Sequence, residues 1–174
     1  VMKELETYRL SLKGLRNGIN TFEYELGPTF FQVFKQQLIN DAFINLKLFV
    51  DKRDELMILD MEHTGYMVTP CDRCLENIKL PLEGKKQLLV KFVPVGKEED
   101  AEVIYLKAES DFFNPAPYMF EFIVLSIPMV RRYDCEQDEE SPCSEEVLRH
   151  LKPKESEINS PIWEELKKLN LNLK

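Results

Sequence analysis

Four cysteines are the residues of this 174-residue chain that point most directly to chemistry. Cys71 and Cys74 form a Cys-x-x-Cys pair, while Cys135 and Cys143 follow later in the chain. Thiolate sulfur is a preferred ligand of Zn²⁺, and a two-residue spacer lets both sulfurs of a pair reach the same ion. The spacing therefore predicts a zinc site formed by Cys71, Cys74, Cys135 and Cys143.

Other roles for these thiols stay open. They could be free thiols without a metal, or Cys71 and Cys74 could be a redox pair, which favours a helix beginning at the first cysteine. The residues after Cys74 alternate like a strand instead. His63 or His150 could replace a cysteine as a metal ligand, although a lone histidine more often faces solvent or forms a hydrogen bond.

The sequence contains no phosphate-binding loop, no His-Glu-x-x-His motif and no recognisable nucleophile-and-base pair. Its acidic residues are typical of a solvated segment rather than of acid–base catalysis. We therefore expect a protein that is not an enzyme.

The formal net charge is −8, and most of it lies in the C-terminal part. Tight RNA binding depends on lysines and arginines that displace counterions from phosphates, so this balance favours basic protein partners. A direct RNA-binding module remains the alternative. It would require a set of basic residues to converge on one face, namely Lys85, Lys86, Lys91, Arg131 and Arg132.

The elements that must position the cysteines read mainly as strands. Apolar residues alternate with polar ones on both sides of Asn17-Gly18, which predicts a hairpin between residues 8–12 and 21–26. A second hairpin is predicted between residues 44–50 and 57–61, and further strands at 78–82, 88–92 and 103–105. Gly84 marks either a turn or a bulge. The Cys71–Cys74 pair should thus lie between two strands.

Two helices are predicted to cover this sheet. The first is indicated by phenylalanines and a leucine at helical spacing, Phe30, Phe31, Phe34 and Leu38. The second runs from Pro117 to Ile127 and is apolar around its circumference, so we expect it to be the most buried element. The predicted fold class is α+β: an antiparallel sheet that could curl into a barrel, covered by one or two helices.

We expect two parts: an α+β core domain at residues 1–133, and an acidic tail at residues 134–174 that carries the second cysteine pair. The segment Ser160–Leu169 has a cap, a first-turn proline and apolar residues at helical spacing. A helix this short needs a surface to pack on, either its own domain or a partner. We predict a partner-binding role for Ile162, Trp163 and Leu166.

The longest apolar stretch, residues 119–130, is far shorter than the ~20 residues that cross a bilayer. Residues 1–10 lack the apolar run of a secretory signal. The sequence therefore predicts a cytoplasmic protein without a membrane partner.

Two stretches of the chain resemble the YceD family. They are the Cys-x-Arg-Cys-Leu sequence Cys71–Leu75 and the later segment Phe120–Pro128, which ends in Leu-x-x-Pro; a late cysteine and the Pro161–Leu166 ending fit the same pattern. This resemblance implies a role in accumulation of large-subunit ribosomal RNA and in ribosome biogenesis. It implies ribosomal proteins or large-subunit assembly intermediates as partners and no catalytic activity. Zinc rests on the cysteine spacing alone.

Overall fold

The computed structural model describes residues 5–36, 38–39, 41–93, 103–134 and 142–151. Eleven elements follow one another along these ranges: η1 (a 3₁₀ helix, Glu6–Tyr8), β1 (Leu10–Ser11), β2 (Gly18–Leu26), α1 (Pro28–Gln32), β3 (Asp41–Lys52), β4 (Leu56–Pro70), β5 (Asn77–Val93), β6 (Val103–Lys107), β7 (Phe112–Phe113), α2 (Ala116–Leu125) and α3 (Glu145–Leu151). Strands dominate, and the helices are short.

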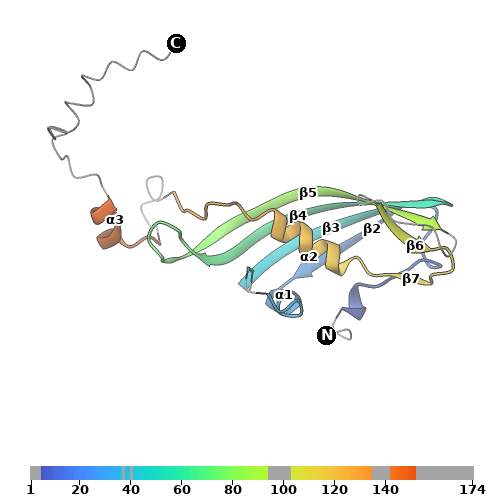
Figure 1. Ribbon diagram of the computed structural model, residues 1–174, viewed down its shortest axis with the longest axis horizontal. Coiled ribbons are helices and arrows are strands. Elements are labelled where there is room, and N and C mark those ends of the chain that lie inside the picture. Colours follow the sequence, from blue (N-terminus) through green and yellow to red (C-terminus); the bar gives the residue numbers. More distant parts are fainter. Residues whose placement is uncertain (1–4, 37, 40, 94–102, 135–141, 152–174) are drawn as a thin grey trace, which may run out of the picture.

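The main sheet has five strands in the order β2-β3-β4-β5-β6. Its first four strands are antiparallel neighbours, and β6 joins β5 in parallel. β1 and β7 form a separate two-stranded sheet. Figure 1 shows the long main sheet with α1 and α2 on one of its faces. The α+β prediction is confirmed, but β2 and β6 are not paired in the described strands, so the sheet is not closed into a barrel.

The core lies on the face of the sheet that carries α1 and α2. Side chains of a strand point alternately to its two faces, so every second residue of β3 and β4 is buried. On β3 these residues are Ala42, Ile44, Leu46, Leu48 and Val50. The predicted hairpin between β3 and β4 is confirmed, with Lys47 opposite Glu62 in its register.

The predicted hairpin around Asn17-Gly18 is wrong. β2 pairs with β3 along its whole length, whereas Leu10 and Ser11 pair with Phe113 and Phe112. The alternating pattern before Gly18 reflects packing on the core, because Leu10, Leu12 and Leu15 are buried there. Gly18 does adopt a positive φ of 90°, so the turn chemistry was correct and the strand partner was not.

The first predicted helix is shorter than its apolar spacing suggested. α1 ends at Gln32, Lys35 has a positive φ of 50°, and Leu38 is 64% exposed. Phe30 and Phe31 are buried. Phe34 lies beyond the helix and stacks on Phe120 of α2, with ring centroids 4.1 Å apart.

The second predicted helix is not the most buried element. α2 buries Ala116, Met119 and Ile123 against the sheet, but Leu125 is 76% exposed. Because the helix lies on one face of the sheet, its apolar outer side has no second layer over it within the described residues (Figure 1). Among the helices in these ranges, none combines the length and the apolar character that spanning a membrane requires.

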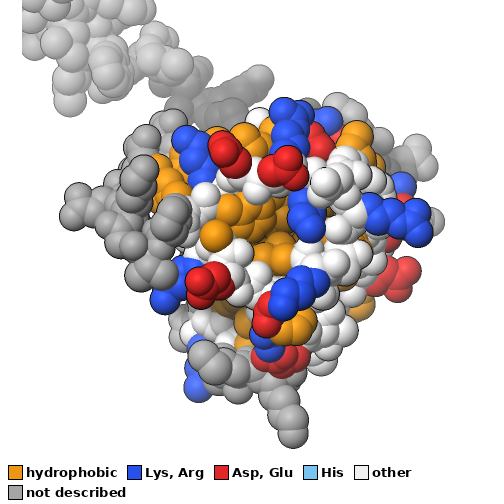
Figure 2. Space-filling model, turned by 90° about the vertical axis from the view of Figure 1, so that its right-hand side faces the viewer, with side chains coloured by type: hydrophobic (Ala, Val, Ile, Leu, Met, Phe, Trp, Pro, Cys, Tyr) orange, Lys and Arg blue, Asp and Glu red, His pale blue; other side chains and the backbone are white. Residues whose placement is uncertain are grey.

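At the opposite end from the cysteines, an apolar hollow is ringed by charged side chains (Figure 2). The segment before β2, the β3–β4 turn, the end of β5 and the residues after β6 line it. Its volume is about 580 Å³. The cations of its rim already have partners: the Lys52 ammonium donates to the Leu12 carbonyl at 2.7 Å, and Arg53 pairs with Asp51. The charged groups at this end of the molecule therefore bond to one another and to the backbone, and they cover the end of the core.

Candidate functional site

The cysteine knuckle, Cys71–Cys74, is the turn between β4 and β5, as the sequence predicted. The Cys71 N–H donates to the Glu76 carbonyl at 2.8 Å, and the Leu75 N–H donates to the Cys71 carbonyl at 2.9 Å. Leu75 closes the turn with a positive φ of 64°, a conformation that a non-glycine residue rarely adopts. The long β4–β5 ladder thus ends in a tight, internally bonded turn.

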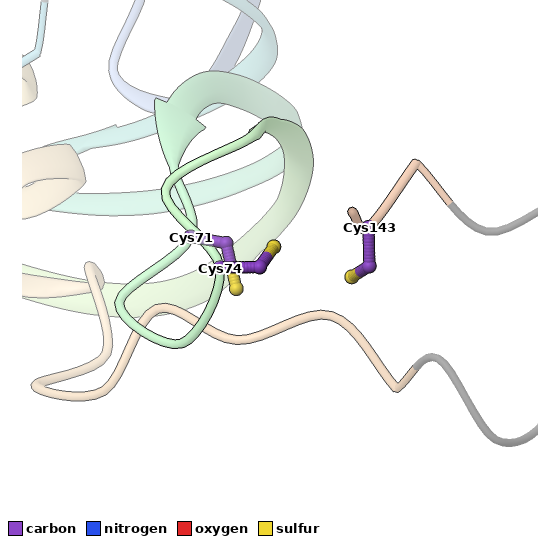
Figure 3. A group of neighbouring side chains, drawn as sticks. All are labelled: Cys71, Cys74 and Cys143. Atoms are coloured by element: carbon purple, nitrogen blue, oxygen red, sulfur yellow. The ribbon is translucent and has the colours of Figure 1, made fainter. Parts of the chain in front are cut away.

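Cys143 comes to this turn from just before α3. The Sγ atoms of Cys71, Cys74 and Cys143 lie within 4.8 Å of one another, and all three side chains are buried. Figure 3 shows the Cys143 side chain directed toward the pair in the knuckle. Cys71 and Cys74 are free thiols, whereas Cys143 is disulfide-bonded in the structure. Cys135, the fourth predicted ligand, lies outside the described residues.

Several backbone groups favour the thiolate form of Cys71. Burial by itself raises the pKa of its thiol, but N–H groups of Tyr133, Arg73 and Cys74 donate to the sulfur and outweigh that effect. The net result is a lowered pKa. The Arg73 N–H lies 3.4 Å from the Cys71 sulfur. A thiol whose pKa is lowered by such donors is a better metal ligand and a better nucleophile.

The three sulfurs have nearly the separation that one zinc ion requires. Four sulfurs at ~2.3 Å from a tetrahedral zinc lie roughly 3.8 Å from one another. A spread of up to 4.8 Å therefore needs only a small adjustment. A ligand sulfur must be a thiolate, so Cys143 can serve only after its disulfide is reduced. The arrangement can hold a metal ion, and the geometry does not specify which one.

A salt-bridged clamp holds the chain beyond α2 against the knuckle. The Arg131 N–H donates to the Asp72 carboxylate at 2.8 Å, and the Asp72 N–H donates to the Arg131 carbonyl at 2.8 Å. The Arg131 guanidinium also bonds Asp72 and the Thr69 hydroxyl. The backbone N–H of Arg131 and then its guanidinium charge hold the pKa of Asp72 below its usual value. The clamp supports the sulfurs without contributing a ligand.

Neither histidine joins the sulfur cluster among the described residues. His63 lies on β4 and is 4% exposed. Its Nε2 lies 2.9 Å from the Ser126 hydroxyl, at the end of α2. Opposite His63 on β5 is Gly84, where a Cβ would lie 2.7 Å from the imidazole Cε1. β5 passes through Gly84 without a break, so this glycine marks neither a turn nor a bulge but the space that the imidazole occupies.

Sequence reasoning missed the Ser126–His63 contact, because the two residues are 63 positions apart and no motif links them. The direction of this hydrogen bond is the opposite of the one that would activate a serine nucleophile. The Ser126 hydroxyl donates to the Ile123 carbonyl at 2.7 Å, so it accepts from His63 Nε2–H instead of giving its proton to the imidazole. This pair therefore positions the imidazole and does not activate the serine.

The basic residues of the RNA-binding alternative are dispersed. Lys85 and Lys91 share one face of β5, and Lys86 points to the other face. Lys85 pairs with Glu62, and Arg131 is engaged in the clamp. The redox alternative lacks the helix that it favours, since Cys71–Cys74 is a turn between strands. Both alternatives stay as predictions.

The predicted partner-binding residues Ile162, Trp163 and Leu166 lie outside the described residues, as does most of the acidic tail. The division into a core at 1–133 and a tail at 134–174 also stays a prediction. Within the described part of the tail, residues 142–151 bring Cys143 to the knuckle and then form α3.

Comparison with known protein families gives a match. A family model described as Large ribosomal RNA subunit accumulation protein YceD matches residues 59–170, which is more than half of the chain. The matched range begins in β4 and includes both the knuckle and α2. No curated protein and no solved structure matches the chain. On the strength of the family match, the chain belongs to the YceD family.

Proposed function

We propose that this protein is a non-enzymatic factor in large-subunit ribosomal RNA accumulation that acts mainly through protein contacts. The family description supplies the cellular role. The observation that supports a binding role over catalysis is the Ser126–His63 contact, which is directed against nucleophile activation. The net charge of −8 supports basic partners such as ribosomal proteins, because opposite charge speeds encounter.

We further propose that Cys71, Cys74, Cys135 and Cys143 hold one zinc ion in the reduced protein. Three of these sulfurs already lie within 4.8 Å of one another. The cytoplasm keeps thiols reduced, which would release Cys143 for metal binding. Zinc would then join the tail to the end of the sheet and add to the stability of that junction.

The proposed contact surface is the tail around Ile162, Trp163 and Leu166. Buried aromatic side chains supply much of the energy of protein interfaces, and Trp163 is the only tryptophan in the chain. The acidic residues that precede it would attract a basic ribosomal protein or assembly intermediate. In this arrangement the zinc site orients the tail, and the tail makes the contact.

The metal is tested by elemental analysis of protein purified under reducing conditions. One zinc per chain is expected, and Cys71→Ser or Cys143→Ser should each reduce it strongly. Ser144→Ala, next to Cys143, is the control and should retain the metal. Full zinc content in the cysteine variants, or none in the wild type, would refute the site.

The cellular role is tested by measuring large-subunit ribosomal RNA in cells that lack the protein and carry variants. Loss of the protein should lower that RNA, and the wild type should restore it. Deletion of residues 155–174, or Trp163→Ala, should leave the core folded but reduce co-purification with large-subunit precursors. Trp163→Phe is the matched control, because it keeps an aromatic anchor. If the deletion unfolds the core, the tail packs on its own domain instead.

A further inference from the structure

A hollow beside α2 is separate from the proposed metal site, because no cysteine lines it. It lies between the end of α2 and β5, and its volume is about 320 Å³. It is lined by His63 of β4, by Phe122, Leu125 and Ser126 on the helix side, and by residues 83–86 of β5, of which Gly84 and Lys86 share the face of His63. This volume is at the lower end of small-molecule sites, about 300–1,000 Å³.

The floor of this hollow carries an unused hydrogen-bond acceptor. The Ser126 hydroxyl gives its proton to the Ile123 carbonyl, so His63 Nε2 must be the protonated nitrogen and Nδ1 carries a lone pair. No partner is found for Nδ1 in the described part of the chain. Side-chain nitrogens and oxygens that are fully buried in these ranges all have partners, so Nδ1 keeps some exposed surface, and the hollow is a cavity that His63 lines.

The protein environment keeps this lone pair available. Burial lowers the pKa of His63, so the imidazole is neutral near pH 7. Gly84 leaves the space that the ring occupies, since a Cβ there would collide with it. The contact with Ser126 then selects the tautomer in which Nδ1 is the acceptor. Such a preorganised acceptor favours a ligand that brings an N–H or O–H donor.

The rim adds one cation and apolar surface. Lys85 pairs with Glu62, which leaves Lys86 as the rim lysine without an ion pair among the described residues. Phe122 offers an aromatic ring and Leu125, at 76% exposure, an open apolar edge. A bound group would thus meet one acceptor, one cation and a ring.

We propose that this hollow binds one nucleotide, with the base inside and the phosphate at the rim. A nucleobase is flat and apolar on its faces and carries N–H donors on its edge, which matches Phe122 and His63 Nδ1. A phosphate matches Lys86. The site is independent of the proposed tail contact and goes beyond it. The nucleotide is either a free mononucleotide or one residue of a single-stranded RNA.

The two sources are separated by titrating the full-length protein with GMP, AMP, UMP and CMP, and with short single-stranded RNA of mixed sequence. Binding of mononucleotides alone identifies a small-molecule site. Tighter binding of RNA, weakened by added salt, identifies an RNA site. Ribose 5-phosphate is the control without a base and should bind at least about tenfold more weakly, since it lacks the donor edge and the stacking face.

His63 offers a matched pair of variants. His63→Gln can keep the donor to Ser126 but places no acceptor at Nδ1, so nucleotide affinity should fall by about tenfold or more. His63→Asn places an oxygen near the Nδ1 position and should retain part of the affinity. Lys86→Ala should weaken binding by about three- to tenfold, whereas Lys47→Ala removes an equal charge from the opposite face and should not.

A measurement on the unaltered protein avoids any folding defect in these variants. Nitrogen NMR of His63 should show an unprotonated Nδ1, whose resonance shifts when a nucleotide is added. The proposal is overturned if no nucleotide or RNA binds, or if binding leaves Nδ1 unshifted and is equal in the Gln and Asn variants. It is also overturned if a basic peptide, and no nucleotide, shifts that resonance.

Discussion

β4 carries two polar sites that differ in how they are held. In its middle, His63 lies inside the ladder, paired with Leu46 on one side and Gly84 on the other. At its end, the cysteine knuckle lies outside the ladder and is held by the Asp72–Arg131 clamp and its own turn. Both sites also contact residues from about Ser126 onward.

The difference shows which part of the molecule carries its stability. Backbone bonds on both sides and a buried apolar face hold the middle of β4, so it should open only when the whole sheet unfolds. The knuckle depends on a few polar contacts with exposed side chains, so it should open locally. A metal ion would therefore add most stability at the knuckle, where the fold has the fewest stabilising contacts.

The largest loss of stability is expected from a change at Gly65, in the middle of β4. A Cβ at this position would overlap the Phe43 carbonyl oxygen and lie 2.8 Å from Ile44 Cα, so the neighbouring strand would have to move. We expect Gly65→Ala to cost about 3 kcal/mol or more of unfolding free energy, measured by urea denaturation. Gly27→Ala, where a Cβ meets nothing within 4 Å, is the control. Equal stability of the two variants would contradict the close approach of β3 and β4 at Gly65.

Next in size is a cavity on the buried face. Leu48 is fully buried between Phe22 and Met61 of the neighbouring strands. Leu48→Ala should destabilise the protein by about 2–5 kcal/mol, through lost burial and the cavity left behind. Lys47→Ala, one residue away on the exposed face, should change stability by less than about 0.5 kcal/mol. Similar losses from both would mean that the two faces are not distinguished as the register requires.

These two regions also show what the sequence could and could not predict. The β3–β4 hairpin and the placement of Cys71–Cys74 between strands were predictable, because period-two alternation and a Cys-x-x-Cys pair are local signals. The partner of β2 was not, since the same alternation fits any neighbouring strand. The approach of Cys143 was expected from chemistry alone. The Ser126–His63 contact has no sequence signal, because only the fold brings α2 over β4.

A smaller effect should appear in the pH dependence of stability. Burial lowers the pKa of His63 in the folded protein, so below about pH 6.5 the unfolded chain binds the proton first. The contribution of the neutral His63 imidazole to stability is complete above that pH and is lost as the pH falls toward the pKa of His63 in the folded protein. His63→Gln should flatten this slope in urea denaturation between pH 8 and 5, in the range where the histidine titrates.

The exposed His150 supplies the matched control for that slope. His150→Gln removes the only other histidine of the chain, from an exposed position in α3, and is the variant to compare with His63→Gln. If the His150 variant flattens the slope and the His63 variant does not, the buried imidazole is not the group that titrates.

The smallest expected effect is at the knuckle, and it sharpens the contrast between local and global opening. Asp72→Asn removes the charge that Arg131 neutralises and one of the two carboxylate oxygens that it bonds. Amide hydrogen exchange over residues 71–76 should then become faster near pH 7, while the global unfolding midpoint stays almost unchanged. Asp60→Asn, whose carboxylate bonds Gln87 on the exposed face of the ladder, should leave exchange in the knuckle as it is.

The dependence of knuckle exchange on pH in the acidic range gives this prediction a second test. Because the pKa of Asp72 is lowered in the folded protein, its contribution is complete above the unfolded value of about 3.9 and is lost as the pH falls through the folded one. The wild type and Asp72→Asn should therefore converge in knuckle exchange at strongly acidic pH and differ near neutrality. If they already agree at pH 7, the clamp does not hold the knuckle, and the turn with its sulfurs must hold itself.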